Sequence, residues 1–144
     1  MVKYINDIAG IRIICSFTSD IYRIADMIRD QKDIRVIAVK DYITYPKASG
    51  YKSYHMIGSI PVYLSDRTVD TKVEIQIRTV AMDFWASLEH KIHYKFEGDA
   101  PENIKNELVE CARMVSDLDA RMLSLNEEIL AISKKQEEEK RQNA

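Results

Sequence analysis

Two hydrophobic periods alternate along the chain and predict a mixture of strands and helices. Short apolar, β-branched runs and one strictly alternating segment predict four strands, at residues 8–17, 34–39, 54–64 and 71–78. Apolar residues spaced three and four apart predict helices at 21–29 and 80–96. Because strands and helices follow one another without a regular repeat, this order predicts an α+β fold, a sheet with helices segregated to one side.

Residues that favour turns separate these elements. Pro46 and Gly50 predict a loop over residues 41–51, and a turn is expected at 65–70. Gly50 would allow the backbone to approach a ligand closely, since it has no Cβ atom. Pro61 indicates an edge or an irregularity in its strand.

The C-terminal part of the chain has the most regular spacing, with apolar residues alternately four and three positions apart. These residues are Ile104, Leu108, Cys111, Val115, Leu118, Met122, Leu125, Ile129 and Ile132. Such a heptad predicts a helix that packs along one seam. A helix of about 30 residues is roughly 45 Å long, too long to lie wholly against one small sheet. We therefore expect a homo-oligomer, and a fraying charged end after Ile132.

Composition and charge narrow the classes of function. The 144 residues carry a net charge of −2, whereas a protein that coats nucleic acid is usually strongly basic. No apolar run approaches the ~20 residues that span a bilayer, and the N-terminus lacks the layout of a signal peptide. The two cysteines, Cys15 and Cys111, form neither a disulfide framework nor a zinc spacing, so we expect two buried thiols in a cytoplasmic protein.

Two segments carry candidate binding residues. Glu74, Gln76 and Arg78 share one face of the strand at 73–78, where they would line a site for an anionic ligand or form an ordinary solvated face. Residues 47–55 contain Tyr51 close in sequence to the cations Lys47 and Lys52 and to His55. This set suits base stacking and phosphate binding, although, taken alone, a loop leading into an aromatic-rich strand explains it better.

Two weaker signals concern metals and a helix face. Asp7, at the start of the first strand, is a candidate magnesium ligand or merely a turn residue. One polar stripe of the helix at 80–96 consists of Asp83, Ser87, His90 and Tyr94. His90 and His93 lack a further clear ligand, so zinc is not favoured.

The joint order of four motifs resembles the synthetase domain of the RelA/SpoT family, most closely the small alarmone synthetases. The motifs are Asp-Ile-Ala-Gly-Ile-Arg (7–12), Gly-Tyr-Lys-Ser-Tyr-His (50–55), Glu-Ile-Gln-Ile-Arg-Thr (74–79) and Met-Asp-Phe-Trp-Ala-Ser-Leu-Glu-His (82–90). The resemblance covers about residues 4–96. It implies a nucleotidyltransferase-like mixed sheet flanked by helices, and transfer of pyrophosphate from ATP to the 3′-hydroxyl of GDP or GTP.

The resemblance also implies roles for individual residues. Asp7 and Glu74 match a magnesium-binding aspartate and a glutamate proposed as general base near the metal. Tyr51 matches the tyrosine that stacks on guanine. Four further matches line the acceptor site: Lys47, His55, Gln76 and Asp83. Arg12, Arg78 and His90 also match motif positions, and the resemblance assigns them no specific role.

One departure from the family concerns the donor nucleotide. The family holds ATP largely through basic residues upstream of the Asp-Ile-Ala-Gly strand, whereas here six residues precede Asp7 and only Lys3 among them is basic. We therefore expect residues 1–96 to be a catalytic core that lacks most of its ATP-binding part through truncation, and residues 97–144 to be a helical oligomerisation segment. The resemblance implies a tetramer, or a dimer without the upstream helices. Alternatives are a non-catalytic guanine-nucleotide-binding or oligomerisation module and a tRNA 3′-end pyrophosphotransferase.

Overall fold

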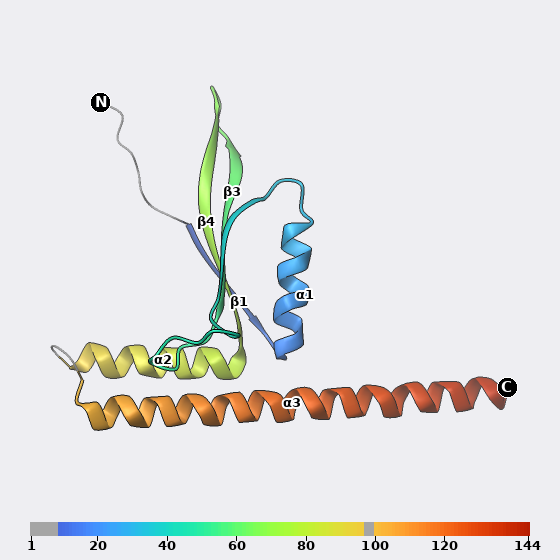
Figure 1. The fold of residues 1–144 in the computed structure, drawn as a ribbon. Coiled ribbons are helices and arrows are strands. Elements are labelled where there is room, and N and C mark those ends of the chain that lie inside the picture. Colours follow the sequence, from blue (N-terminus) through green and yellow to red (C-terminus); the bar gives the residue numbers. More distant parts are fainter. Residues whose placement is uncertain (1–8, 97–99) are drawn as a thin grey trace, which may run out of the picture.

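The computed structural model describes residues 9–96 and 100–144, which form one sheet and three helices (Figure 1). The elements in chain order are β1 (Ala9–Cys15), α1 (Thr18–Arg29), β2 (Arg35–Asp41), β3 (Tyr54–Tyr63), β4 (Thr68–Thr79), α2 (Val80–Lys95) and α3 (Glu102–Gln142). This order matches the one predicted from hydrophobic periodicity, and the α+β class is confirmed.

The four strands form one mixed sheet in the order β1-β4-β3-β2. β1 lies parallel to β4, with Arg12 opposite Gln76, whereas β3 is antiparallel to both β4 and β2. Since β4 pairs with the first strand and with its own hairpin partner, it is the strand on which both halves of the sheet meet. Residues 73–77 of β4 therefore have strand neighbours on both sides.

The two faces of the sheet differ in chemistry. Val73, Ile75 and Ile77 of β4 are buried with Ile21 and Ala25 of α1, which covers this face (Figure 1). On the opposite face, the same alternation exposes Glu74 and Gln76 beside polar residues of the neighbouring strands. The strict period of two therefore produces one core face and one polar face, as predicted.

Helix α3 runs back alongside α2 and then continues far beyond it (Figure 1). Trp85 on α2 donates its indole N–H to the carbonyl of Leu108, at 2.9 Å. The hydroxyl of Thr79, which caps α2, donates to Asp119 Oδ2 at 2.8 Å, and both residues are buried. These polar contacts attach the first half of α3 to the end of β4 and to α2.

Two predicted boundaries were wrong. The turn expected at 65–70 is shorter, because β4 begins at Thr68 and pairs with Tyr63, and Leu64 N–H donates to the Arg67 carbonyl at 2.7 Å. The charged end of the chain does not fray after Ile132, since α3 remains helical to Gln142. Lys, Glu, Gln and Arg are good helix formers, which allows the helix to continue without burial. The 41 residues of α3 correspond to about 60 Å.

The buried positions on α3 also differ from the predicted heptad seam. Leu108 is buried as expected, but the next buried positions on α3 are Ala112 and Asp119 rather than Cys111 and Leu118. A straight helix with 3.6 residues per turn drifts away from a strict seven-residue repeat, so the contact line moves by one position. The expectation of two buried thiols is also wrong: Cys111 lies off this contact line and is exposed, and Cys15, at the end of β1, is half-buried.

Within residues 9–96 and 100–144, no helix is long and apolar enough to cross a membrane.

The buried carboxyl of Asp119 should make the stability of the fold depend on pH. Burial raises its pKa, and the hydrogen bond from Thr79 opposes this shift. A carboxyl with a raised pKa binds its proton more readily in the folded protein than in the unfolded chain. Its contribution to stability is therefore greatest below about pH 4 and is lost as the pH rises through the folded-state pKa.

Asp119→Asn keeps an acceptor for Thr79 but cannot ionise. We expect urea unfolding to show that this variant is more stable than the wild type at about pH 7, and that the difference shrinks toward pH ~4. Asp117→Asn, at an exposed position on the same helix, should show no such pH-dependent gain. A constant difference at all pH values would contradict the assignment to Asp119.

Candidate active site

The polar face of the sheet gathers most of the residues predicted to bind a ligand. Glu74, Gln76 and Arg78 come from β4, His55 from β3, and Arg12 from β1, where register places Arg12 opposite Gln76 and His55 on the other side of Gln76. The cluster is completed by Lys47 and Tyr51 in the loop before β3 and by Asp83 in the first turn of α2.

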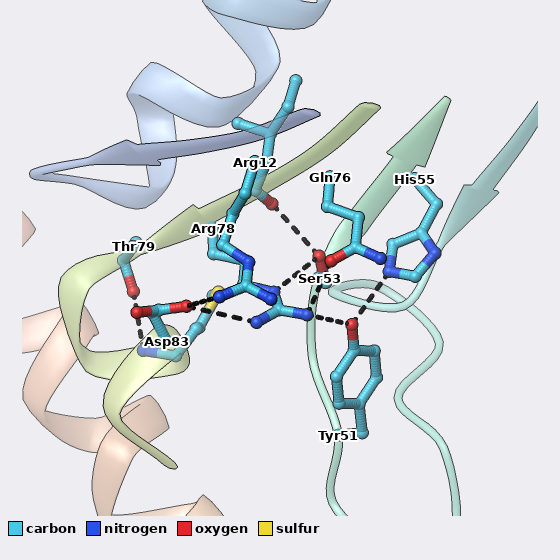
Figure 2. A network of polar contacts seen from close by, with 10 residues as sticks. Arg12, Tyr51, Ser53, His55, Gln76, Arg78, Thr79 and Asp83 are labelled. Atoms are coloured by element: carbon cyan, nitrogen blue, oxygen red, sulfur yellow. Dashed lines mark hydrogen bonds and ion pairs between the residues drawn. The ribbon is translucent and has the colours of Figure 1, made fainter. Parts of the chain in front are cut away.

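The guanidinium of Arg78 is the centre of the cluster (Figure 2). It is 5% exposed and donates to Tyr51 Oη at 2.6 Å and to Gln76 Oε1 at 2.8 Å. It also donates to Ser53 Oγ at 3.3 Å and to Asp83 Oδ1 at 3.2 Å. One buried cation thus joins the loop, the sheet and α2 through charge-assisted and neutral hydrogen bonds.

Aromatic rings and cations lie close together at the loop. The Tyr51 hydroxyl is 3.0 Å from His55 Nε2, and the rings of Tyr42, Tyr51 and His55 contact one another edge to face. Lys47 Nζ lies 4.9 Å from the centroid of the Tyr42 ring and 5.1 Å from that of Tyr51. This group presents aromatic surface and positive charge together, which suits a base and its phosphates.

Glu74 lies between two depressions in the polar face. A cleft of about 340 Å³ is lined by Glu74, His55, Lys47 and Tyr42, together with Lys40 and the apolar residues Ala38 and Ile57. A second cleft of about 230 Å³ is lined by Glu74, Gln76, Gly10, Ile11 and Arg12. One carboxylate therefore borders both, so groups bound in the two clefts would meet beside it.

The carboxylate of Glu74 has two close polar neighbours. Its Oε1 atom lies 3.4 Å from His55 Nδ1 and accepts from Gln76 Nε2 at 3.4 Å. Burial lowers the pKa of His55, and the negative charge of Glu74 opposes that shift while Arg78 and Lys47 reinforce it. A lowered pKa favours the neutral imidazole, which can both donate and accept a hydrogen bond.

Arg12 and His90, two further predicted residues, have different environments. Arg12 Nη1 is 3.4 Å from Asp83 Oδ1, the same oxygen that accepts from Arg78, so this carboxylate links β1 to the cluster. His90 is exposed on α2, and the described contacts do not bring it to the cluster. The polar stripe of α2 therefore contributes Asp83 to this face, while Tyr94 is solvent-exposed.

The expected role of Gly50 in approaching a ligand is not what the structure shows. Gly50 has φ of +95°, and a Cβ atom there would lie 2.6 Å from the Cβ of Ala112 on α3. The close approach is thus made to another part of the chain. The glycine is needed both for its left-handed backbone and for this contact.

Among the polar residues that line the larger cleft, two were not predicted, Tyr42 and Lys40. Lys40 is opposite His55 in the register of β2 and β3, and Tyr42 follows directly after β2. Each lies at or directly after the end of β2, and the sequence predicts the end of a strand only to within a few residues. A signal existed in the alternation of β2, since Ala38, Lys40 and Tyr42 are two positions apart and line one cleft.

The donor set is compatible with magnesium, although it is incomplete in the described residues. Among residues 9–96 and 100–144, no group of three or more His, Cys, Asp or Glu side chains could hold a metal ion. Magnesium commonly uses one or two carboxylates, with phosphate oxygens and water completing its shell. Glu74 can supply one such carboxylate, while the predicted second ligand, Asp7, lies outside the described residues.

Comparisons with known proteins identify the family. A sequence model of the region found in RelA / SpoT proteins matches residues 1–99. GTP pyrophosphokinase YwaC of Bacillus subtilis (strain 168) is 51% identical over 129 residues, which are 90% of this chain and 61% of the relative. The chain thus spans about three fifths of the length of this relative.

Solved structures agree in fold as well as sequence. Small alarmone synthetase 2 from Bacillus subtilis superposes with a TM-score of 0.83 at 51% identity, covering 88% of this chain and 69% of that one. Small alarmone synthetase 1 from the same organism, bound to its product pppGpp, gives a TM-score of 0.80 at 40% identity, covering 83% and 62%. Because the family model matches residues 1–99 and a solved relative shares both the fold and 51% sequence identity, the chain belongs to the RelA/SpoT family.

Proposed function

We propose that this chain carries the acceptor-nucleotide side of a (p)ppGpp synthetase, a GTP pyrophosphokinase that transfers pyrophosphate from ATP to the 3′-hydroxyl of GDP or GTP. The observation that carries the proposal is the position of Glu74 on the border of two clefts, one with aromatic rings and Lys47, the other with Arg12. A relative named GTP pyrophosphokinase and a related structure bound to pppGpp support the same reaction.

In this proposal the guanine nucleotide occupies the larger cleft. The base stacks on Tyr51, which does not itself line this cleft but contacts its lining residues Tyr42 and His55. Lys47, which lies 5.1 Å from the Tyr51 ring, neutralises phosphate charge. His55 and Gln76 flank Glu74 and supply polar contacts to the sugar and the base edge. The smaller cleft beside Arg12 receives the donor phosphates, because a half-exposed guanidinium there can pair with phosphate oxygens.

Glu74 acts as general base. The 3′-oxygen of the acceptor forms a bond to the β-phosphorus of ATP while the bond from that phosphorus to the oxygen of AMP breaks. The hydroxyl proton passes to the Glu74 carboxylate, which His55 and Gln76 hold in place from the side. AMP leaves with the electron pair of the broken bond, and the acceptor carries the pyrophosphate.

Glu74 and Asp7 are the residues proposed to hold magnesium. When bound, the ion would offset negative charge on the triphosphate. The proposed compartment is the cytoplasm, where nucleotides are present and free thiols such as those of Cys15 and Cys111 persist.

We also propose that the second half of α3 assembles a homo-oligomer. Met122, Leu125 and Ile129 are all about half exposed or more, and Leu118 and Met122 border an apolar groove of about 440 Å³ between α2 and α3. Contiguous apolar surface of this kind favours association. Residues 1–96 remain the proposed catalytic core, with 97–144 as the assembly segment.

Transfer by the wild type and by Glu74→Gln tests the reaction. With labelled ATP and GDP, we expect product from the wild type and a turnover about 10²- to 10⁴-fold lower in the variant, since the amide cannot accept the proton. GDP affinity should change little. Glu110→Gln, on the exposed face of α3, is the matched control.

Other results of the same assay separate the alternatives. GDP binding without any transfer would indicate a non-catalytic guanine-nucleotide module. Transfer to the 3′ end of tRNA in place of GDP or GTP would indicate the tRNA pyrophosphotransferase. Equal turnover by Glu74→Gln and the wild type would remove Glu74 as the base.

Calorimetry with GDP tests the stacking residue. Tyr51→Ala should weaken binding by about 1–3 kcal/mol, the usual contribution of base–aromatic stacking. Tyr51→Phe keeps the ring but loses the hydroxyl bonded to Arg78, so it should retain most of the affinity. Tyr45→Ala, at an exposed tyrosine of the same loop, is the control. A larger loss in Tyr42→Ala than in Tyr51→Ala would place the base on Tyr42.

Light scattering tests the assembly. We expect the wild type to be a dimer or tetramer at tens of micromolar, and Leu125→Lys/Ile129→Lys to dissociate it, because each buried aliphatic side chain contributes roughly 1.5–3 kcal/mol. Gln136→Lys/Gln142→Lys, at exposed positions of the same helix, should leave the oligomer intact. A monomeric wild type would end the proposal.

A further inference from the structure

The segment from Lys47 to Ser53, which we call the 47–53 loop, is a tight turn that determines where Tyr51 lies. Gly50 N–H donates to the Lys47 carbonyl at 2.9 Å, and Lys47 N–H donates to the Tyr51 carbonyl at 3.2 Å. These two bonds close the loop on itself. Any displacement of its base therefore moves Lys47 and Tyr51 together.

The first anchor of this loop is a close contact with α3. At Gly50, which has φ of +95°, an added Cβ atom would lie 2.6 Å from Ala112 Cβ and 3.5 Å from the Trp85 ring. Ala112 is itself buried in the cluster formed by Trp85, Ala86 and Leu108. Because both residues at the contact are the smallest that fit, the loop backbone lies directly on the helix.

The second anchor is polar and stands one helical turn further along α3. Lys52 Nζ donates to Ser116 Oγ, and Ser116 Oγ donates to the Ala112 carbonyl at 3.0 Å. Both anchors are on one face of α3, since residues four apart share a face. Tyr51 lies between the two anchored residues and packs against the same cluster from the loop side.

The opposite end of the loop is not packed in this way. Ala48 and Ser49 are exposed and border a cavity of about 370 Å³ shared with the first turns of α3, at Glu102, Lys105 and Asn106. The loop is therefore held to the helix mainly at Gly50 and Lys52. Its geometry depends on two side chains of α3 that do not line either cleft.

We propose that Ala112 and Ser116 of α3 are positioning residues for guanine-nucleotide binding, acting through the 47–53 loop on Tyr51 and Lys47. This inference rests on the proposed function of Tyr51. It assigns the first half of α3 a role in substrate affinity that is separate from the role of its second half in assembly. The effect is selective, because the smaller cleft beside Arg12 has no lining residue from this loop.

The experiment uses the whole chain and two variants of α3, Ser116→Ala and Ala112→Val. Ser116→Ala removes the acceptor of Lys52, and Ala112→Val pushes against Gly50. Each should raise the KM for GDP about 10-fold, the effect expected from losing one charge-assisted hydrogen bond or from modest overpacking. The KM for ATP and kcat should stay close to wild type.

Two further measurements separate positioning from general destabilisation. Ser116→Thr keeps the hydroxyl and should restore the KM for GDP. The amide protons of Lys47 and Gly50, which close the loop, should exchange about 10-fold faster in Ser116→Ala, because the loop opens locally more often. Ser124→Ala and Ala120→Val, at exposed positions of the same helix, are the matched controls for both readouts.

The outcomes test the inference about α3 and the proposed function separately. If the wild type binds GDP while Ser116→Ala matches Ser124→Ala in KM and in exchange, the inference is overturned. An equal rise in the KM for ATP and GDP also overturns it, since that indicates a general structural effect. A wild type that binds no GDP overturns the proposed function and the guanine role with it, and the exchange rates then decide whether α3 holds the loop. If Ala112→Val does not fold, the comparison of Ser116→Ala with Ser124→Ala in KM and in exchange decides the inference by itself.

Discussion

The arrangement of the polar face depends on one buried cation. Arg78 lies on β4 at a position where alternation turns its side chain away from the core, yet it is 5% exposed. A buried guanidinium is costly unless charge and hydrogen bonds satisfy it. Here three parts of the fold supply four partners: a carboxylate from α2, an amide oxygen from β4 and two hydroxyls from the loop before β3.

This requirement explains why residues distant in sequence occupy fixed positions. The guanidinium is planar and directs its donors in a rigid fork, so its partners must lie in particular directions. Tyr51 receives one of these donors and is thereby held beside His55, which in turn lies beside Glu74. Asp83 accepts from Arg78 and also contacts Arg12, which extends the arrangement to β1. The candidate base and the aromatic cleft therefore share one rigid support.

Much of the fold could be predicted from periodicity. The alternation over β4 identified both faces of the sheet, and the helical spacing located α1 and α2, because burial on one side produces those patterns directly. The order of the four motifs identified the family. The chemistry of the individual residues did not identify it. The structure places His55 next to both Glu74 and the Tyr51 hydroxyl, and the binding roles of these residues stay a prediction.

Other features depend on contacts between segments that no local pattern records. The contact of Gly50 with Ala112 joins a loop to a helix, so a glycine near a motif was assigned to a ligand instead. The burial of Asp119, a charged residue in a helix, follows only once Thr79 is known to face it. Tyr42 lines the cleft because β2 ends just before it. The position of Asp7 lies outside the described residues, and its pairing with Glu74 stays a prediction.

The parallel pairing of β1 with β4 has a consequence for how the protein is made. Cys15 contacts the Arg78 carbonyl across a separation of 63 positions, and Lys52 contacts Ser116 across 64. At a synthesis rate of about 5–20 residues per second, several seconds pass before each pair can meet. The hairpin of β3 and β4 can close early, while β1 waits for its partner and the 47–53 loop waits for α3. In a nascent chain, the candidate site therefore acquires its geometry only after the part of α3 that contains Ala112 and Ser116 has left the ribosome.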